Sequence, residues 1–168
     1  MTLELEEELR QIGWFSQRRV DDAQVAEWLR MAVQYLGCHI FPEAVRVLRE
    51  YGGLTFGSLH FSPEGSLISE DRTQWLYWEW QLNEVLFPIA YELGDIFIYA
   101  LSSTGKVYGR GVCDIFVGDS FEEFLSNTVA YRKGKIKWSD NTPMHWTVEM
   151  DAEFNQLYKA VYETNNAD

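Results

Sequence analysis

The sequence is poor in the residues that mark disulfide frameworks and membrane spans. Only two cysteines, Cys38 and Cys113, occur in 168 residues, and they are too few for a disulfide framework. Both have apolar neighbours, where a free cysteine acts as a small hydrophobic side chain. No run approaches the roughly 18 apolar residues that span a bilayer. The segment 1–10 holds four glutamates, unlike the positive, apolar start of a secretion signal. We therefore expect a reduced cytoplasmic protein with unbonded, buried cysteines and no membrane partner.

Positive charge is also scarce. The chain has 14 basic and 26 acidic side chains, and its net charge is −12. Such a chain repels a phosphate backbone, so direct binding of nucleic acid is not expected. Between residues 73 and 131, eight acids face two bases, Lys106 and Arg110. This imbalance indicates either a solvated face or an anionic docking surface for a basic partner. The eight acids are Glu79, Glu84, Glu92, Asp95, Asp114, Asp119, Glu122 and Glu123.

The motifs of enzymes and metal sites are absent. The three histidines, His39, His60 and His145, form no H-E-x-x-H pattern, and no G-x-S-x-G is present. Adjacent helical residues such as Glu122 and Glu123 point about 100° apart, which is the wrong geometry for two carboxylates sharing a proton. We predict no catalytic residues, no bound metal and no cofactor. A carboxylate-dependent hydrolase is the weakest of the functions considered.

The composition predicts one folded domain. With 46% hydrophobic and 15% aromatic residues, the chain can bury a bulky core. Apolar residues at helical spacing predict three helices in the first half, near Leu3–Ile12, over Asp22–Leu36 and from Pro42 to Tyr51. Gly52 and Gly53 follow the third helix, and we expect one of them to have a positive φ.

The second half has the pattern of a mainly antiparallel sheet. The segment 95–101 is apolar on both faces, which is typical of a central strand. Trp75, Trp78 and Leu82 favour a helix that buries its tryptophans, although Leu76, Trp78 and Trp80 also fit a strand. Ser120 and Glu123 predict a capping box before a helix that buries Phe121, Phe124, Leu125 and Val129. Other expected segments are strands at 54–57, 58–61, 87–93, 106–108 and 112–117, a polar loop at 63–71, a short strand near Ile136 and Trp138, and a last helix from Asp151. The fold class is α+β in a single domain, 1–168, with flanking C-terminal helices.

Six short motifs follow one another along the chain: Gly13–Phe15 with Arg18–Asp21, Phe41–Ala44, Leu48–Leu54, Leu86–Ile89, Gly105–Tyr108 and Val117–Glu123. In this order and spacing they resemble the third subfamily of the SUKH immunity-protein superfamily, the group that includes the yeast cell-wall-assembly regulator. The resemblance covers about residues 13–130. Residues 132–168 show no resemblance, and that segment begins with a basic cluster, Arg132, Lys133, Lys135 and Lys137.

The resemblance implies an α+β fold and a non-catalytic bacterial protein that binds and neutralises a cognate polymorphic toxin, often a nuclease. The alternative is a peptide- or protein-binding regulator of the same fold without a toxin. An inhibitor of a nuclease-like toxin gains by offering carboxylates to the basic substrate groove. The candidate toxin-binding residues are Glu92, Asp114, Asp119 and Glu122, whereas Gly52, Gly53, Ser120 and Glu123 are expected to be structural.

Overall fold

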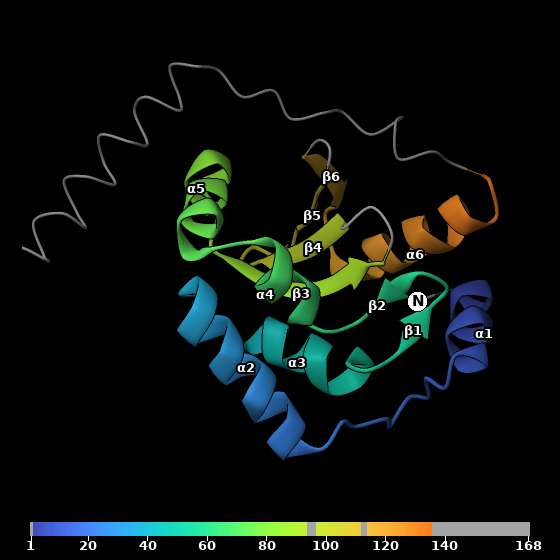
Figure 1. Cartoon of the computed structure of the whole chain (residues 1–168). Helices are drawn as coiled ribbons and strands as arrows, with labels where there is room; N and C mark the ends of the chain where they lie inside the picture. Colours follow the sequence, from blue (N-terminus) through green and yellow to red (C-terminus); the bar gives the residue numbers. More distant parts are fainter. Residues whose placement is uncertain (1, 94–96, 112–113, 136–168) are drawn as a thin grey trace, which may run out of the picture.

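Six helices and a six-stranded antiparallel sheet make up the fold in the computed structural model, which describes residues 2–93, 97–111 and 114–135 (Figure 1). The predicted α+β class is confirmed, and the strands lie side by side in chain order. The helices are α1 (Leu3–Gln11), α2 (Asp22–Leu36), α3 (Pro42–Tyr51), α4 (Glu64–Ser69), α5 (Arg72–Leu82) and α6 (Phe121–Arg132). The strands are β1 (Thr55–Phe56), β2 (Leu59–His60), β3 (Leu86–Glu92), β4 (Phe97–Ser102), β5 (Val107–Arg110) and β6 (Ile115–Gly118).

The three N-terminal helices begin and end close to the predicted residues, because their local signals are strong. Thr2 caps α1, and the carboxylate of Asp21 accepts the backbone N–H of Ala23 at 2.9 Å at the start of α2. Pro42 occupies the first turn of α3, where its missing N–H costs nothing. None of the helices in the described part of the chain is long and apolar enough to cross a membrane.

The two glycines after α3 have different roles. Gly53 has φ +76°, which confirms the expected left-handed residue. Gly52 has φ −51°, so its backbone could hold any residue. A Cβ at Gly52 would lie 2.4 Å from the carbonyl oxygen of Leu48 and 2.5 Å from the ring of Trp28. Gly52 is therefore needed for close packing and Gly53 for backbone conformation.

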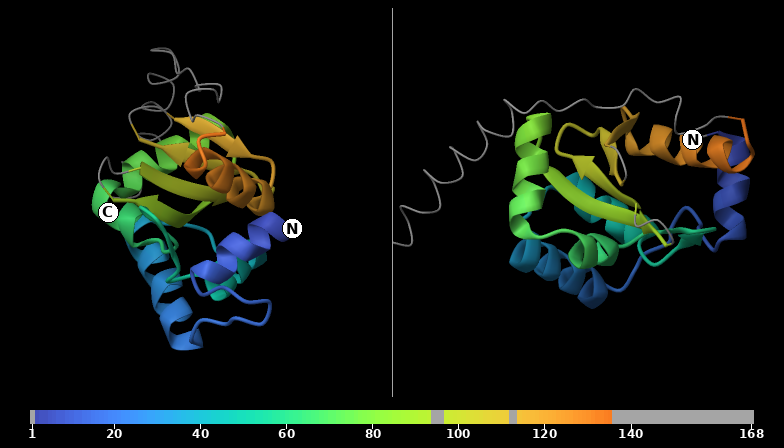
Figure 2. Two further views of the ribbon diagram at one scale, coloured as in Figure 1. Left: turned by 90° about the vertical axis from the view of Figure 1, so that its right-hand side faces the viewer. Right: turned by 45° about the horizontal axis from the view of Figure 1, so that its top comes forward.

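The middle of the sheet is buried on both faces, as predicted. Neighbouring residues Ile98 and Tyr99 of β4 point to opposite faces, and each is 1% exposed. Tyr99 contacts Phe124 of α6, with ring centroids 5.0 Å apart. Ile98 pairs with Arg110, whose guanidinium lies over Trp78 of α5. The strands thus lie between α5 and α6, as Figure 2 shows.

The segment 63–71 was predicted to be a polar loop, and this prediction is wrong. It contains α4, in which Gly65 and Ser66 are buried. A Cβ at Gly65 would lie 2.1 Å from the ring of Tyr91, so α4 packs closely against β3. The loop prediction failed because the burial of this segment comes from a distant strand rather than from its own periodicity.

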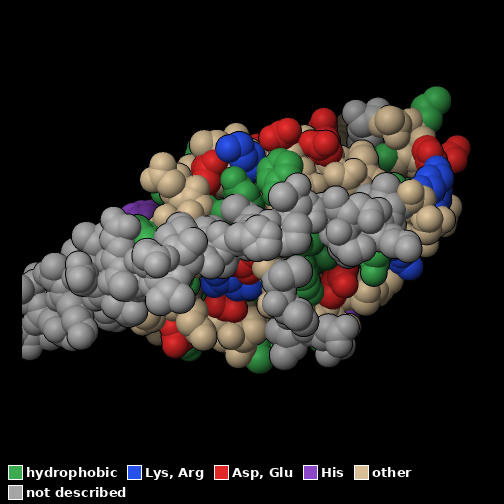
Figure 3. All heavy atoms as spheres, turned by 90° about the horizontal axis from the view of Figure 1, so that it is seen from above, with side chains coloured by type: hydrophobic (Ala, Val, Ile, Leu, Met, Phe, Trp, Pro, Cys, Tyr) green, Lys and Arg blue, Asp and Glu red, His purple; other side chains and the backbone are tan. Residues whose placement is uncertain are grey.

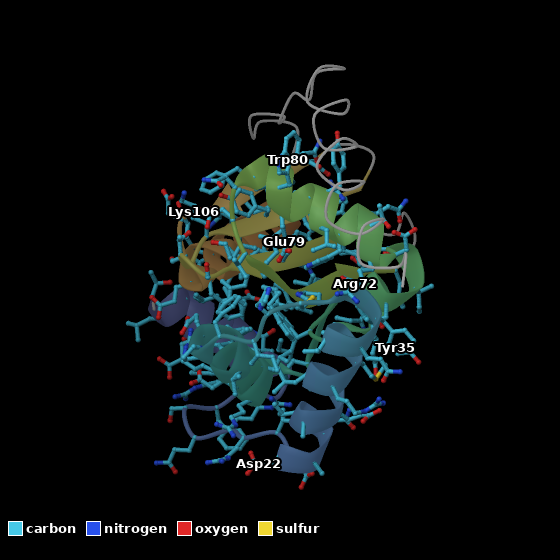
Figure 4. The ribbon with its side chains drawn as sticks, turned by 90° about the vertical axis from the view of Figure 1, so that its left-hand side faces the viewer. Asp22, Tyr35, Arg72, Glu79, Trp80 and Lys106 are labelled. Carbon is cyan, nitrogen blue, oxygen red and sulfur yellow. The ribbon has the colours of Figure 1, made fainter. Side chains whose placement is uncertain are left out.

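The helical interpretation of the tryptophan-rich segment is confirmed. Asp71 and Gln74 form a capping box at the start of α5, and Trp75 and Trp78 are fully buried. The carboxylate of Glu79, which is labelled in Figure 4, accepts the backbone N–H of Leu86 at 2.8 Å. This bond joins α5 to the first residue of β3.

Only half of the capping box predicted before α6 forms as expected. The hydroxyl of Ser120 accepts the backbone N–H of Glu123 at 3.1 Å. The carboxylate of Glu123 accepts the backbone N–H of Asp119 at 2.7 Å, one residue before the expected donor, Ser120. Phe121, Phe124, Leu125 and Val129 are buried as predicted.

Some expected elements fall outside the described part of the chain. These are the strand near Ile136, the last helix from Asp151 and the environment of Cys113. Cys38 is free and 3% exposed, as expected. Burial, followed by the negative charge of Glu79, raises the pKa of its thiol.

Replacement of the two glycines separates conformational strain from close packing. Gly53→Ala should lower the free energy of unfolding by about 1 kcal/mol because of its positive φ. Gly52→Ala should cost more, about 2 kcal/mol or above, because its Cβ meets a backbone oxygen and the Trp28 ring. Urea denaturation measures both values. Equal, small losses at both positions would contradict the packing role of Gly52.

The thiol of Cys38 should be nearly inert in the folded protein. In a Cys113→Ser variant, a thiol-reactive disulfide reagent should react slowly under native conditions and rapidly in urea, because the thiol is buried and its pKa is raised. The absorbance of the released reagent thiol gives both rates. Fast reaction in the native state would show that Cys38 is accessible.

Candidate functional site

The four predicted toxin-binding carboxylates are not brought together into one site. Asp119 and Glu122 lie at the start of α6, and both are exposed. Glu92 ends β3, on the strand face that also carries Tyr99. Asp114 precedes β6 and is buried. The set therefore divides into one exposed pair and two separate side chains.

The exposed pair at the start of α6 is held on a well-ordered backbone turn. The bonds of Ser120 and Glu123 fix the turn, so Glu123 is a structural residue as predicted. The side chains of Asp119 and Glu122 form no ion pair with any other described residue. The charge of Glu122 contributes to a raised pKa of Tyr51, which is about 12. Burial is the largest cause of this rise, the charge of Glu50 is the next, and the charge of Glu122 is smaller. We refer to Asp119 and Glu122 together as the α6 acidic surface.

Glu92 is half-buried and already has a partner. Its carboxylate accepts the hydroxyl proton of Tyr99 at 3.1 Å. Burial and the neighbouring Glu92 charge both raise the pKa of Tyr99, so this hydroxyl stays a donor. Glu92 thus helps to fix the aromatic ring against α6.

Asp114, predicted from the sequence as a toxin-binding residue, is buried in the structure. Its side chain is 9% exposed and forms a two-point contact with Arg110, at 3.0 Å from Nε and 2.9 Å from an Nη. The count of acids along the chain could not show this pairing, because it assigns charge without contacts. Asp114 belongs to the interior.

Arg110 is the centre of a buried polar network beneath α5. Its guanidinium donates to Gln81 Oε1 at 3.3 Å and to the Gln74 carbonyl oxygen at 3.2 Å, and it lies 4.5 Å from the Trp78 ring centroid. Glu70 lies 3.6 Å away, and burial raises the pKa of Glu70 while Arg110 opposes the rise. This network ties β5 to α4 and α5, and no sequence motif indicated it.

Basic side chains gather around a cleft beside α3. The cavity has a volume of about 450 Å³, and four arginines line it. Two of them share the carboxylate of Asp22, which Figure 4 shows at the N-terminal end of α2, opposite to Tyr35. The Asp22 oxygens lie 3.1 Å from Arg19 and 3.4 Å from Arg49. Arg46 pairs with Glu43 and Glu50, so three carboxylates offset the charge of three of the four arginines. The four arginines are Arg18, Arg19, Arg46 and Arg49.

The basic cluster after α6 is joined to the first helix. Lys133 lies 2.8 Å from both Glu4 and Glu8, and Lys135 lies 3.2 Å from Glu4. The Arg132 guanidinium lies over the ring of Phe56 at 4.4 Å. Lys137 is outside the described residues. Figure 3 shows acidic side chains (red) next to basic side chains (blue) on one face of the protein.

The described residues form no group of three or more His, Cys, Asp or Glu side chains that could hold a metal ion. Of the described histidines, His39 lies between α2 and α3, and His60 lies in β2.

Removal of the Arg110 charge should be costly. Arg110→Met should lower the free energy of unfolding by about 3 kcal/mol at pH 7, because it leaves Glu70 and Asp114 buried without their cation. The deficit should shrink as the pH falls, because burial already raises the pKa of Glu70 and protonation of Glu70 in the folded variant removes a charge left without its cation. Urea denaturation across a pH series measures both effects.

Arg30→Met is the matched control for this variant. Arg30 is half-exposed in its pair with Glu27, and loss of such a pair should cost less than about 1 kcal/mol. Equal losses in the two variants would contradict a structural role for the Arg110 network.

Comparison with known families gives a match that spans most of the chain. The SUKH-3 immunity protein family matches residues 1–131, which include every described strand and nearly all of α6. No match was found among curated proteins or among solved structures. The resemblance predicted from the motifs is confirmed, and the chain belongs to the SUKH-3 immunity protein family.

Proposed function

We propose that this protein is a non-catalytic bacterial immunity protein that binds and neutralises a cognate toxin in the cytoplasm. The toxin is a protein with a basic substrate groove, such as a nuclease. The observation that supports this function best is membership of an immunity protein family over residues 1–131. The net charge of −12 suits the same role, because it attracts a basic protein and repels nucleic acid.

The α6 acidic surface is the first contact region that we propose. Most other acidic side chains of the described helices are engaged in ion pairs within the protein, such as Glu43 and Glu50 with Arg46. Asp119 and Glu122 are exposed, and their turn is held rigid by Ser120 and Glu123. Carboxylates on a fixed turn can replace the phosphates of a substrate in a basic groove without a large loss of conformational entropy.

The two remaining candidates contribute differently in this proposal. Glu92 keeps one carboxylate oxygen on Tyr99 and remains half-exposed, so it serves as a secondary contact. Asp114 holds Arg110 in the interior and is excluded from the contact region.

Neutralisation of the α6 acidic surface should slow binding of the toxin. The partner for this experiment is the toxin encoded beside the gene of this protein, made as an inactive variant. Asp119→Asn/Glu122→Gln should reduce the association rate constant about three- to tenfold at low salt, because long-range attraction steers the encounter. Stopped-flow measurements over a salt series should also show a weaker salt dependence. The free energy of unfolding should change by less than about 1 kcal/mol.

A double variant with the same net charge provides the control. Glu7→Gln/Glu27→Gln removes two exposed carboxylates, one from α2 and one from α1, which Lys133 joins to the C-terminal end of α6 rather than to its start. Its association rate should stay close to that of the parent protein. If both double variants slow association equally, total charge rather than the α6 acidic surface controls the encounter. If the parent protein does not bind the toxin at all, the regulatory-module alternative replaces the proposed function.

A further inference from the structure

A small cavity with aromatic walls lies between α2, the start of α4 and the β2–β3 pair. Its volume is about 170 Å³, below the roughly 300 Å³ at which sites for small molecules begin. A space of this size suits one inserted side chain. Trp28, His60 and Tyr91 supply aromatic rings to its wall, and Ser62 and Glu64 supply polar groups. We call this space the Glu64 cavity.

The carboxylate of Glu64 is fixed at the cavity and has spare acceptor capacity. Oε1 accepts the indole N–H of Trp28 at 3.3 Å, and Oε2 accepts the hydroxyl proton of Ser62 at 3.2 Å. A carboxylate has about four acceptor positions, so about two stay open. The cavity lining contains this one carboxylate and no Lys or Arg side chain. The Arg18 guanidinium, 4.0 Å from the position of a Cβ at Gly53, donates to the carbonyl oxygens of Glu50 and Gly52.

Two glycines make room for the aromatic wall. Gly52 has an ordinary φ, yet a Cβ there would lie 2.5 Å from the Trp28 ring. Gly65 lies inside α4, where glycine costs about 1 kcal/mol relative to alanine. A Cβ at Gly65 would lie 2.1 Å from the ring of Tyr91. Both rings therefore occupy positions that only glycine neighbours permit.

The ring of His60 is positioned by two contacts. His60 stacks on Tyr91 with ring centroids 5.1 Å apart and an angle of 18° between the planes. Its Nδ1 lies 3.2 Å from the hydroxyl of Thr55. The cavity thus combines the rings of Trp28 and Tyr91, which are of the types that attract cations through their faces, with the carboxylate of Glu64.

We infer that the Glu64 cavity takes the cationic side chain of one Lys or Arg of the toxin. This inference rests on the proposed function, because it needs a basic protein partner. The apolar stem of the inserted residue packs against the rings, and its charged head donates to Glu64. Glu64 is exposed in the free protein, and the inserted side chain covers it in the complex. A charge pair that is covered in the complex controls dissociation, whereas charges that stay exposed at the rim control association.

A titration without toxin tests the cavity directly. The probes are Nα-acetyl-lysine amide and Nα-acetyl-arginine amide, with Nα-acetyl-norleucine amide as the uncharged control. The indole N–H resonance of Trp28, assigned by its loss in Trp28→Phe, should shift with a cationic probe and not with the norleucine probe. Glu64→Gln keeps the side-chain shape and should abolish the shift, whereas Glu7→Gln should preserve it. An unmoved Trp28 resonance with both cationic probes overturns the inference.

Toxin dissociation is the second measurement. The toxin should leave Glu64→Gln at least about tenfold faster than the parent protein, with an association rate within about twofold. Tyr91→Phe should dissociate at close to the parental rate, and Tyr91→Leu should dissociate faster because the aromatic face is lost. Parental dissociation from Glu64→Gln overturns the inference even if the probes bind, because the toxin then does not use the cavity. In that case binding of the parent protein to the toxin still decides the proposed function.

Discussion

The double-sided burial of the central strands is the constraint that orders the fold. Ile98, Tyr99, Ala100 and Leu101 are consecutive and almost completely buried, so apolar surface faces both sides of β4. Such a strand is stable in water only when both faces of the sheet are covered. The aromatic residues of α6 cover the Tyr99 face, and α5 covers the Ile98 face through Trp78. The positions of α5 and α6 follow from the need to cover both faces of the sheet. The exposed turn before α6 is one consequence of the position of that helix.

Local signals in the sequence predicted most of the elements. Apolar spacing and caps predicted α2, α3 and α5, and the two-sided apolar pattern predicted β4 as a central strand. The sequence did not predict α4, because Gly65 and Ser66 are buried by a contact with Tyr91 of β3. It also did not predict the Arg110 network, which joins Glu70, Arg110 and Asp114 from three elements. Arg110 and Asp114 are only four residues apart, but the contacts of Arg110 with Glu70 and Gln81, like that of Gly65 with Tyr91, join distant segments. Periodicity contains no information on such long-range contacts.

The candidate site, like the fold, could be predicted from the sequence only where local signals determine it. A helix N-terminus with acids was visible in Ser120–Glu123, and the structure keeps Asp119 and Glu122 exposed there. The position of Asp114 was not visible, because a buried guanidinium needs carboxylates and takes those that the fold brings near. No sequence pattern indicated a role for Glu64. Its role depends on Trp28, which is 36 residues away, and on two glycines that look like ordinary helix ends or breaks.

The two acidic regions have different physical uses. The charge of Asp119 and Glu122 extends into solvent, where it acts over about the 10 Å Debye length at 0.1 M salt. It can guide a basic partner, but water screens it too strongly for it to hold that partner tightly. Glu64 is also exposed, but two hydrogen bonds hold its carboxylate beside Trp28, so its charge acts at contact distance on a group that enters the cavity. In the proposed function an immunity protein needs both fast capture and slow release, since a toxin that escapes acts on the cell. We propose that the acids at α6 serve the first requirement and that Glu64 at its aromatic cavity serves the second.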